Sequence, residues 1–299
     1  MRALVVDPTA PQAVRVAEVD EPVPGPRQVL LEVNHAALNR GDLNDARSGR
    51  LPPGAVLGSD AAGVVLRGED SGPAPGTRVV AMASGAFAER IVADIGSLAV
   101  VPSTVDLAQA AAVPVAGVAA LRALRAAGPL IGRRVLITGA AGGVGRFAVQ
   151  LASIGGAHVV AVVGSAARGE GLKELGADEV RVGLDGIDSP VDVVVENVGG
   201  PLLVAAWQLL APGGSLQSVG WTSGEPAVFP PYSTIGPAKS LISFLNDGEV
   251  ASELSTLVRL VQERELQVEI GWRGPLEKFA DAAEALSDRR INGKAVLDV

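Results

Sequence analysis

A glycine-rich segment of the chain has the residue types and spacing to hold a phosphate. The segment Val135 to Ala152 reads VLITGAAGGVGRFAVQLA, and its glycines lie between an apolar strand and an apolar helix. Small residues let backbone N–H groups approach a pyrophosphate, whose charge is favoured at a helix N-terminus. Against the pattern G-x-G-x-x-G, Ala140 replaces the first glycine, and Gly142 and Gly145 match the others. The alternative is a tight turn that binds nothing.

The residues about 20 positions further on distinguish the two nicotinamide dinucleotides. An NAD site carries Asp or Glu there, which binds the ribose 2′-hydroxyl. Here the segment reads VVGSAARGEG, so Gly164 and Ser165 take this place and the nearest charge is Arg168. A hydroxyl and a guanidinium can both donate to a 2′-phosphate. The segment therefore predicts NADP(H), the alternative being that Arg168 is a solvated cation at a helix start.

The elements around this segment alternate between strand and helix. Asp106 can cap a helix predicted over Leu107 to Ala127, and a further helix is predicted over Ala167 to Leu175. The strands between them are almost continuously apolar, as in a parallel sheet covered by helices on both faces. This part of the chain is predicted to be a doubly wound α/β sheet.

The first hundred residues have a different texture. Short β-rich runs are separated by Pro and Gly, which is typical of an antiparallel, barrel-like domain. A tail from Val268 returns to strand, helix and strand and is expected to rejoin this domain. The predicted division is therefore 1–106 and 268–299 for a β-rich domain, with 107–267 as the inserted dinucleotide-binding domain.

Composition excludes several classes of function. The chain has 299 residues with a formal charge of -8 and few aromatic residues, so a nucleic-acid partner is not expected. It has no Cys, and His35 and His158 are its only His residues, so the usual catalytic zinc site is not expected either. No signal pattern or membrane-spanning apolar stretch is present, which predicts a cytoplasmic protein without a membrane partner.

Six segments taken together resemble a known family. They are AALNRGDLNDARSG (36–49), PGAVLGSDAAGVV (53–65), AAVPVAGVAALRAL (111–124), GAAGGVG (139–145), ENVGG (196–200) and NGKAVL (292–297). In this order and spacing the chain resembles the zinc-independent medium-chain dehydrogenase/reductases, particularly the NADPH:quinone reductases. The resemblance implies a GroES-like catalytic domain that carries an inserted Rossmann domain. Zinc-dependent relatives have Cys and His where this chain has Asn39 and Ser59.

The resemblance also implies roles for individual residues. Asn39 and Asp42 match the family's Asn-x-x-Asp and are the expected catalytic residues, with turn capping as the alternative role. The expected cofactor contacts beyond Gly142, Gly164, Ser165 and Arg168 are Gly143, Val144, Asn197, Gly220, Trp221, Phe244, Leu245 and Arg289.

The expected activity is metal-independent hydride transfer from NADPH to a small-molecule quinone or α,β-unsaturated carbonyl. The alternative is an NADP-binding sensor or structural protein with little turnover, because the family's Tyr after Asn-x-x-Asp is Leu43 here and no general acid is obvious. The apolar run Ser240 to Leu245 predicts an edge strand that pairs in a homodimer, unless residues 226–237 cover that edge in a monomer.

Overall fold

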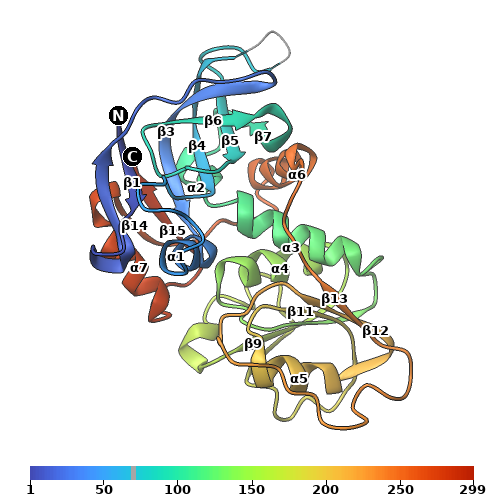
Figure 1. Ribbon diagram of the computed structural model, residues 1–299. Coiled ribbons are helices and arrows are strands. Elements are labelled where there is room, and N and C mark those ends of the chain that lie inside the picture. Colours follow the sequence, from blue (N-terminus) through green and yellow to red (C-terminus); the bar gives the residue numbers. More distant parts are fainter. Residues whose placement is uncertain (69–71) are drawn as a thin grey trace. The chain divides into compact units, whose positions relative to one another are not determined.

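The computed structural model describes residues 1–68 and 72–299. It separates into two compact units (Figure 1), here called unit 1 (Met1–Val118 and Asp247–Val299) and unit 2 (Ala119–Asn246). The boundaries predicted from the sequence, after residues 106 and 267, divide the chain differently and stay a prediction.

Unit 1 is built around a mostly antiparallel sheet. Its order is β14-β15-β3-β4-β5-β7, with β6 also paired to β3, and only β14 and β15 run parallel to each other. A separate antiparallel pair joins β1 to β2. The strands are β1 (Arg2–Val6), β2 (Val14–Glu18), β3 (Gln28–Leu38), β4 (Asp60–Arg67), β5 (Arg78–Met82), β6 (Arg90–Asp94), β7 (Leu98–Val100), β14 (Ile270–Pro275) and β15 (Lys294–Asp298).

The helices of unit 1 are short and connect these strands. They are α1 (Arg40–Arg47), α2 (Leu107–Ala111), α6 (Ala251–Gln262) and α7 (Phe279–Ser287), with 3-10 turns η1 (Pro11–Ala13), η2 (Ile95–Ser97) and η4 (Leu276–Lys278). Helix α3 (Pro114–Ala126) contains the boundary to unit 2.

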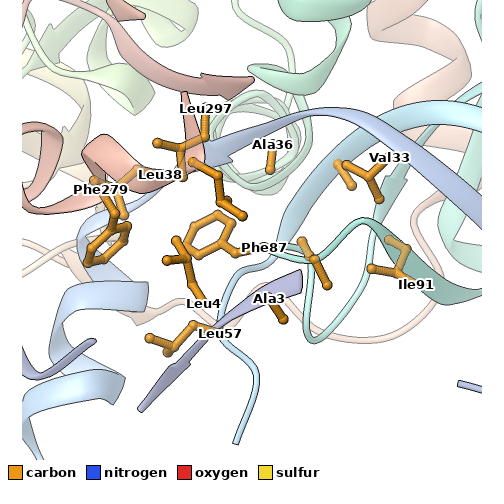
Figure 2. Packing of buried hydrophobic residues seen from close by; sticks show 14 of the residues in the cluster. Ala3, Leu4, Val33, Ala36, Leu38, Leu57, Phe87, Ile91, Phe279 and Leu297 are labelled. Atoms are coloured by element: carbon orange, nitrogen blue, oxygen red, sulfur yellow. The ribbon is translucent and has the colours of Figure 1, made fainter. Parts of the chain in front are cut away.

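The core of unit 1 is centred on an aromatic side chain. Figure 2 shows the Phe87 ring between Leu4 and Leu38, and all three side chains are at most 2 % exposed. The Phe87 ring also packs against Phe279 of α7, with the ring centres 5.9 Å apart. This packing brings the C-terminal segment of the chain into the same core as its first strand.

Unit 2 is an open parallel sheet with the order β10-β9-β8-β11-β12-β13. Its helix α4 lies on one face and α5 on the other (Figure 1), which is the doubly wound arrangement predicted from the sequence. The elements are β8 (Arg134–Ile137), α4 (Gly143–Ile154), β9 (His158–Val163), η3 (Ala166–Gly169), β10 (Glu179–Val182), β11 (Val191–Glu196), α5 (Gly200–Gln208), β12 (Leu210–Ser218) and β13 (Ser240–Ser243).

Two predicted helices are wrong in extent. The helix predicted over 107–127 is two helices, because Pro114 has no N–H for a helical hydrogen bond and begins α3 instead. The predicted cap of its first part is confirmed, since Asp106 accepts hydrogen bonds from Ala108 N at 2.8 Å and Gln109 N at 3.1 Å. The helix predicted over 167–175 is only the short η3 followed by turns, where Gly171 has a φ of 76°.

Candidate functional site

The register of three strands brings distant polar residues together at one end of the unit 1 sheet. Asn39 directly follows β3. Asp60 is the first residue of β4 and pairs with Ala37 of β3. Lys294 is the first residue of β15, and the residue after it pairs with Leu38 of β3. Adding Asp42 and Ser59 gives a set of five side chains, here called the unit 1 cluster. Of these, Asp42, Asp60 and Lys294 are each at most 4 % exposed, whereas Asn39 and Ser59 are half-buried.

Lys294 and Asp60 form a buried ion pair within the unit 1 cluster. Lys294 Nζ donates to Asp60 Oδ2 at 3.0 Å and to Asn39 Oδ1 at 2.6 Å. Asp60 also accepts from Asn39 Nδ2 at 2.9 Å and, through its other oxygen, from Val115 N at 2.8 Å. Asp60 is therefore fully hydrogen-bonded as a carboxylate, and both polar atoms of the Asn39 amide have partners inside the protein.

Asp42 is the second carboxyl of the unit 1 cluster. As the third residue of α1 it accepts from the backbone N–H of Asn39 at 2.7 Å, which is the capping bond expected under the alternative role, and its other oxygen accepts from Ser59 Oγ at 2.8 Å. Burial, followed by the negative charge of Asp60, raises the pKa of Asp42 to about 7. The hydrogen bonds from Asn39 and Ser59 and the charge of Lys294 lower this pKa without offsetting the rise.

Gly58 fixes the backbone that carries Ser59. Its φ is 103°, and a Cβ at this position would lie 2.5 Å from the Phe87 ring. Only glycine allows both the conformation and the close approach. The core of unit 1 therefore sets the position of the Ser59 hydroxyl toward Asp42.

The glycine turn of unit 2 lies where the strand order reverses. The carboxyl ends of β8 and β11 are neighbours, and α4 begins directly after the turn with Gly142 as its N-cap. In open parallel sheets this switch point is where ligands bind. Gly143 and Val144 form the first residues of α4, so the structure places the predicted pyrophosphate contacts at a helix N-terminus.

Gly145 lets α4 approach the preceding turn. A Cβ there would lie 2.4 Å from Gly139 O and 2.6 Å from Ala140 Cα, which is too close for any side chain. Close packing of α4 on the preceding turn therefore explains why the third position of the motif, Gly145, is a glycine.

We predict that Gly145→Ala lowers the free energy of unfolding by about 1–3 kcal/mol, the usual cost of overpacking. The cause is the displacement of α4 from the turn, and urea unfolding followed by circular dichroism measures it. Gly164→Ala is the matched control, because a Cβ there meets nothing within 4 Å. Equal stability of the two variants would contradict this account of Gly145.

A buried hydrogen-bonded group links the ends of β8 and β11. Thr138 Oγ1 donates to Glu196 Oε1 at 2.8 Å and accepts from Asn197 N at 2.9 Å, and Asn197 Nδ2 donates to Thr138 O at 2.8 Å. Glu196 also accepts from Val198 N and Gly199 N, and burial raises its pKa despite these bonds. Asn197 Oδ1 is buried and accepts no hydrogen bond from the described residues, so an acceptor remains open at the switch point.

The remaining predicted contacts fall into both units. In unit 2, Gly164 and Ser165 follow β9 and are exposed, and Arg168 lies in η3. Gly220 follows β12 with its N–H bonded to Glu196 O. Three side chains complete the set: Trp221 packs over Gly199, Phe244 follows β13 half-buried, and Leu245 is exposed.

Arg289 belongs to unit 1, where it follows α7 with a φ of 59°. The structure thus brings Gly142, Gly143, Val144 and Asn197 together around the switch point, and it places Asn39 and Asp42 in the unit 1 cluster.

Sequence reasoning missed Asp60 and Lys294 as site residues. Both lie in segments that carried the family resemblance, GSDAAG and NGKAVL, but no role was inferred for either. The available signal was a charged residue at the start of an otherwise apolar strand, which is costly unless it is paired. The pairing itself depends on a contact between residues 234 positions apart.

Two structural observations concern metals and membranes. Among the residues that the structure describes, no three His, Asp or Glu side chains are grouped so as to hold a metal ion. Over the same residues, no helix has the length and apolar character needed to cross a bilayer.

Comparison with known proteins identifies two family domains. Residues 25–103 match the alcohol dehydrogenase GroES-like domain, and residues 143–263 match the zinc-binding dehydrogenase domain. These matches agree with the architecture described above for the β-rich sheet and for the parallel sheet.

Individual relatives extend over most of the chain. It is 32 % identical to a chloroplast envelope quinone oxidoreductase homolog of Arabidopsis thaliana, over all of this chain and 98 % of that one. A mycobacterial protein solved as a complex with NADPH is 27 % identical, with a TM-score of 0.89 and full coverage of both chains.

Other relatives are much larger proteins. The chain is 32 % identical to the pikromycin polyketide synthase component PikAII of Streptomyces venezuelae over 94 % of its own length, but it spans only 8 % of that protein. The full-length matches to single-chain relatives, together with both domain matches, decide the family. The chain belongs to the medium-chain dehydrogenase/reductase family and is quinone reductase-like within it.

Proposed function

We propose that the protein transfers a hydride from NADPH to a quinone or to an α,β-unsaturated carbonyl compound, without a metal ion. The observation that carries this proposal is the glycine turn at the switch point of unit 2, in a chain whose relatives are quinone oxidoreductases. NADP(H) supplies the hydride when bound, and the protein's own contribution is binding, orientation and charge stabilisation.

The residues around the switch point fit this cofactor. Gly142 and Gly143 leave room for a pyrophosphate at the N-terminus of α4, and the open Asn197 Oδ1 can accept a hydrogen bond from a ribose or amide group. Ser165 and Arg168 follow β9, where they would face a 2′-phosphate, and no carboxylate occupies that strand end.

The unit 1 cluster supports metal-independent chemistry. Asn39 and Ser59 stand at the positions of the Cys and His of zinc-dependent relatives, and their polar atoms bond to Lys294, Asp60 and Asp42 instead. A neutral amide and a hydroxyl are poor zinc ligands compared with thiolate and imidazole. The ammonium of Lys294 already supplies the cation that balances Asp60.

Assay of NADPH oxidation against a panel of acceptors tests the proposed function. The panel contains benzoquinones, naphthoquinones, an α,β-unsaturated ketone and an α,β-unsaturated thioester, with the matching saturated compounds as controls. We expect NADPH to be oxidised with the quinones or with the α,β-unsaturated compounds, and not with the saturated controls. A chelator should leave the rate of oxidation unchanged. Tight NADPH binding without oxidation by any acceptor would instead favour the sensor or structural alternative.

We predict that NADPH binds more tightly than NADH and that Arg168→Ala removes about ten- to a hundredfold of the NADPH affinity. A charge-assisted hydrogen bond to a guanidinium is worth about 1.5–3 kcal/mol, and half-burial of Arg168 places the effect toward the lower end. Isothermal titration with both cofactors measures it.

The exposed Gly164 allows the converse change. Gly164→Asp places a carboxylate where a Cβ meets nothing within 4 Å, so it should weaken NADPH binding by repulsion and spare NADH. Lys173→Ala, which removes one exposed positive charge in the same unit, is the control for a general charge effect. Equal weakening of both cofactors by Arg168→Ala would contradict the proposed 2′-phosphate pocket.

We further propose a homodimer that pairs through β13. This strand is the last of the unit 2 sheet and pairs with β12 on its other side, and Leu241 on it is 46 % exposed. Residues 226–237 are held against α5, through Trp207 Nε1 donating to Ser233 O at 3.0 Å and the edge-on packing of Phe229 on Trp207. An unpaired strand edge is a template for a second copy.

Sedimentation at micromolar concentration should therefore show a species of about twice the 30.2 kDa chain mass. Ile242→Pro in β13, which removes one backbone donor, should shift the population toward the monomer. A monomer in the unsubstituted protein would contradict the proposal.

A further inference from the structure

One buried acceptor of unit 2 lies at the switch point without a donor. Asn197 directly follows β11 and is 8 % exposed, and its Oδ1 accepts no hydrogen bond from the described residues. The orientation of this amide is fixed, because Nδ2 donates to Thr138 O at 2.8 Å and a carbonyl oxygen can only accept. A buried acceptor without a donor is costly, so Oδ1 indicates a donor that the described chain does not supply.

Two glycines bring neighbouring backbone close to Asn197. A Cβ on Gly139, in the glycine turn before α4, would lie 3.4 Å from Asn197 Cβ. A Cβ on Gly220, which follows β12, would lie 2.8 Å from Asn197 O, which is too close for any side chain. Asn197 therefore lies beside the turn that leads into the N-terminus of α4, where a phosphate is expected to bind.

The strand order of unit 2 assigns Asn197 to one half of a dinucleotide. Neighbouring strands at this edge are β9, β8, β11 and β12 in that order, about 5 Å apart. The proposed 2′-phosphate contacts, Ser165 and Arg168, follow β9, and the glycine turn that would hold the pyrophosphate follows β8. A dinucleotide that crosses the edge in this direction has its nicotinamide riboside at the ends of β11 and β12. Asn197 therefore lies on the nicotinamide side of the glycine turn.

A buried carboxylate holds these strand ends together. Glu196 is fully buried, and its carboxylate accepts from Thr138 Oγ1 at 2.8 Å, from Val198 N at 3.0 Å and from Gly199 N at 2.8 Å. Its backbone carbonyl accepts from Gly220 N at 3.1 Å. Glu196 thus joins the ends of β8, β11 and β12 to the beginning of α5.

Thr138 links this carboxylate to Asn197. The Thr138 hydroxyl donates its hydrogen to Glu196, and its oxygen accepts from Asn197 N at 2.9 Å. The backbone carbonyl of the same threonine accepts from Asn197 Nδ2. Both the backbone and the side chain of Asn197 are therefore held by Thr138, and Oδ1 is left as the open acceptor.

We propose that Glu196 and Thr138 are positioning residues that hold Asn197 Oδ1 as the acceptor for a hydroxyl or amide donor of the nicotinamide riboside half of the cofactor. The inference rests on the proposed function and extends it from the phosphates of the cofactor to its reactive end. Asn197 alone would touch the cofactor, and the other two residues act through it. Hydride transfer requires the reactive end to be held in one orientation, which a fixed acceptor provides.

Isothermal titration with two probes separates the halves of the cofactor. NADPH carries both halves, whereas adenosine 2′,5′-bisphosphate carries the 2′-phosphate and one 5′-phosphate without the nicotinamide riboside. Thr138→Val keeps the shape of the side chain and removes its hydroxyl. This variant should bind NADPH about tenfold more weakly, the effect of about one hydrogen bond, and its affinity for the bisphosphate should change by less than about twofold.

Two control variants separate the hydroxyl from a general effect of substitution. Thr138→Ser keeps both hydrogen bonds of Oγ1 and should bind NADPH as tightly as the unsubstituted protein does. Thr256→Val makes the same chemical change in α6 of unit 1, where Oγ1 donates to Ser252 O at 2.9 Å. This second control should leave the affinities for both probes unchanged.

Variants of the other two residues test the rest of the group. Glu196→Gln introduces an NH₂ group that meets a donor whichever way the amide is turned, because all three partners of the carboxylate are donors. It should therefore weaken NADPH binding as Thr138→Val does and spare the bisphosphate. Asn197→Ala removes Oδ1 itself and leaves Thr138 Oγ1 bonded to Glu196, so it decides the question by the same titrations should Thr138→Val fail to fold.

Equal weakening of NADPH and bisphosphate binding by Thr138→Val would overturn the inference, because Thr138 would then support the switch point as a whole. Unchanged NADPH affinity in Asn197→Ala would also overturn it, since Oδ1 would then accept from a buried water and not from the cofactor. Both outcomes leave the proposed function standing, because the unsubstituted protein still binds NADPH. Failure of the unsubstituted protein to bind either probe would overturn the proposed function and the inference with it.

Discussion

Lys294→Met is expected to lower the free energy of unfolding by about 3–5 kcal/mol at pH 8, the usual loss when one partner of a buried ion pair is removed. Lys294 is 4 % exposed and Asp60 is fully buried, so the methionine leaves a carboxylate that water cannot reach. Asn39 Oδ1 also loses its donor. Urea unfolding at pH 8 measures the loss.

An exposed ion pair provides the matched control for this substitution. Lys278 and Asp281 are both more than 60 % exposed, so Lys278→Met should leave the stability almost unchanged. Combining Lys294→Met with Asp60→Asn removes both charges and should recover part of the loss. A loss for Lys294→Met as small as that for Lys278→Met would show that the buried pair does not hold the strand ends together.

Features that depend on local sequence could be predicted. The glycine turn, the apolar strands on each side of it and the Asp106 cap follow from residues within one or two turns of each other. Asn39 and Asp42 were found through the family resemblance, and the structure shows that these two residues of Asn-x-x-Asp meet at a helix start. In contrast, the residues that turn this pair into a cluster come from β4 and β15, and their approach depends on strand register.

The predicted helices failed where a local rule was outweighed. Apolar residues over 107–127 favour one long helix, but Pro114 begins a second helix because it has no N–H for a helical hydrogen bond. In the segment 167–175, the glycines at 169 and 171 outweigh the helical pattern. The pKa of Asp42 illustrates the limit of sequence reasoning, because both of its main causes, burial and the charge of Asp60, exist only in the folded chain.

The stability of the protein should fall as pH rises from 4 to 8 because of Asp42. The pKa of this group is 3.8 as a model value and about 7 in the folded protein, so between these pH values the folded state binds more protons than the unfolded state. The free energy of unfolding then decreases with rising pH. At about 1.4 kcal/mol for each tenfold change in proton affinity, the total decrease from this group is about 4 kcal/mol.

Asp42→Asn is expected to remove this decrease, because its amide can donate to Ser59 and accept from Asn39 N, as the protonated carboxyl does, but does not titrate. The stability of the variant relative to the unsubstituted protein should therefore rise by about 4 kcal/mol between pH 4 and pH 8. Taking this difference cancels the effect of Glu196, whose raised pKa acts in the same direction in both proteins. Asp45→Asn should show no such trend, and a pH-independent difference for Asp42→Asn would mean that Asp42 is ionised in the folded state at pH 4. Above pH 7 the variant should thus be the more stable protein, since its amide keeps both hydrogen bonds without a buried negative charge.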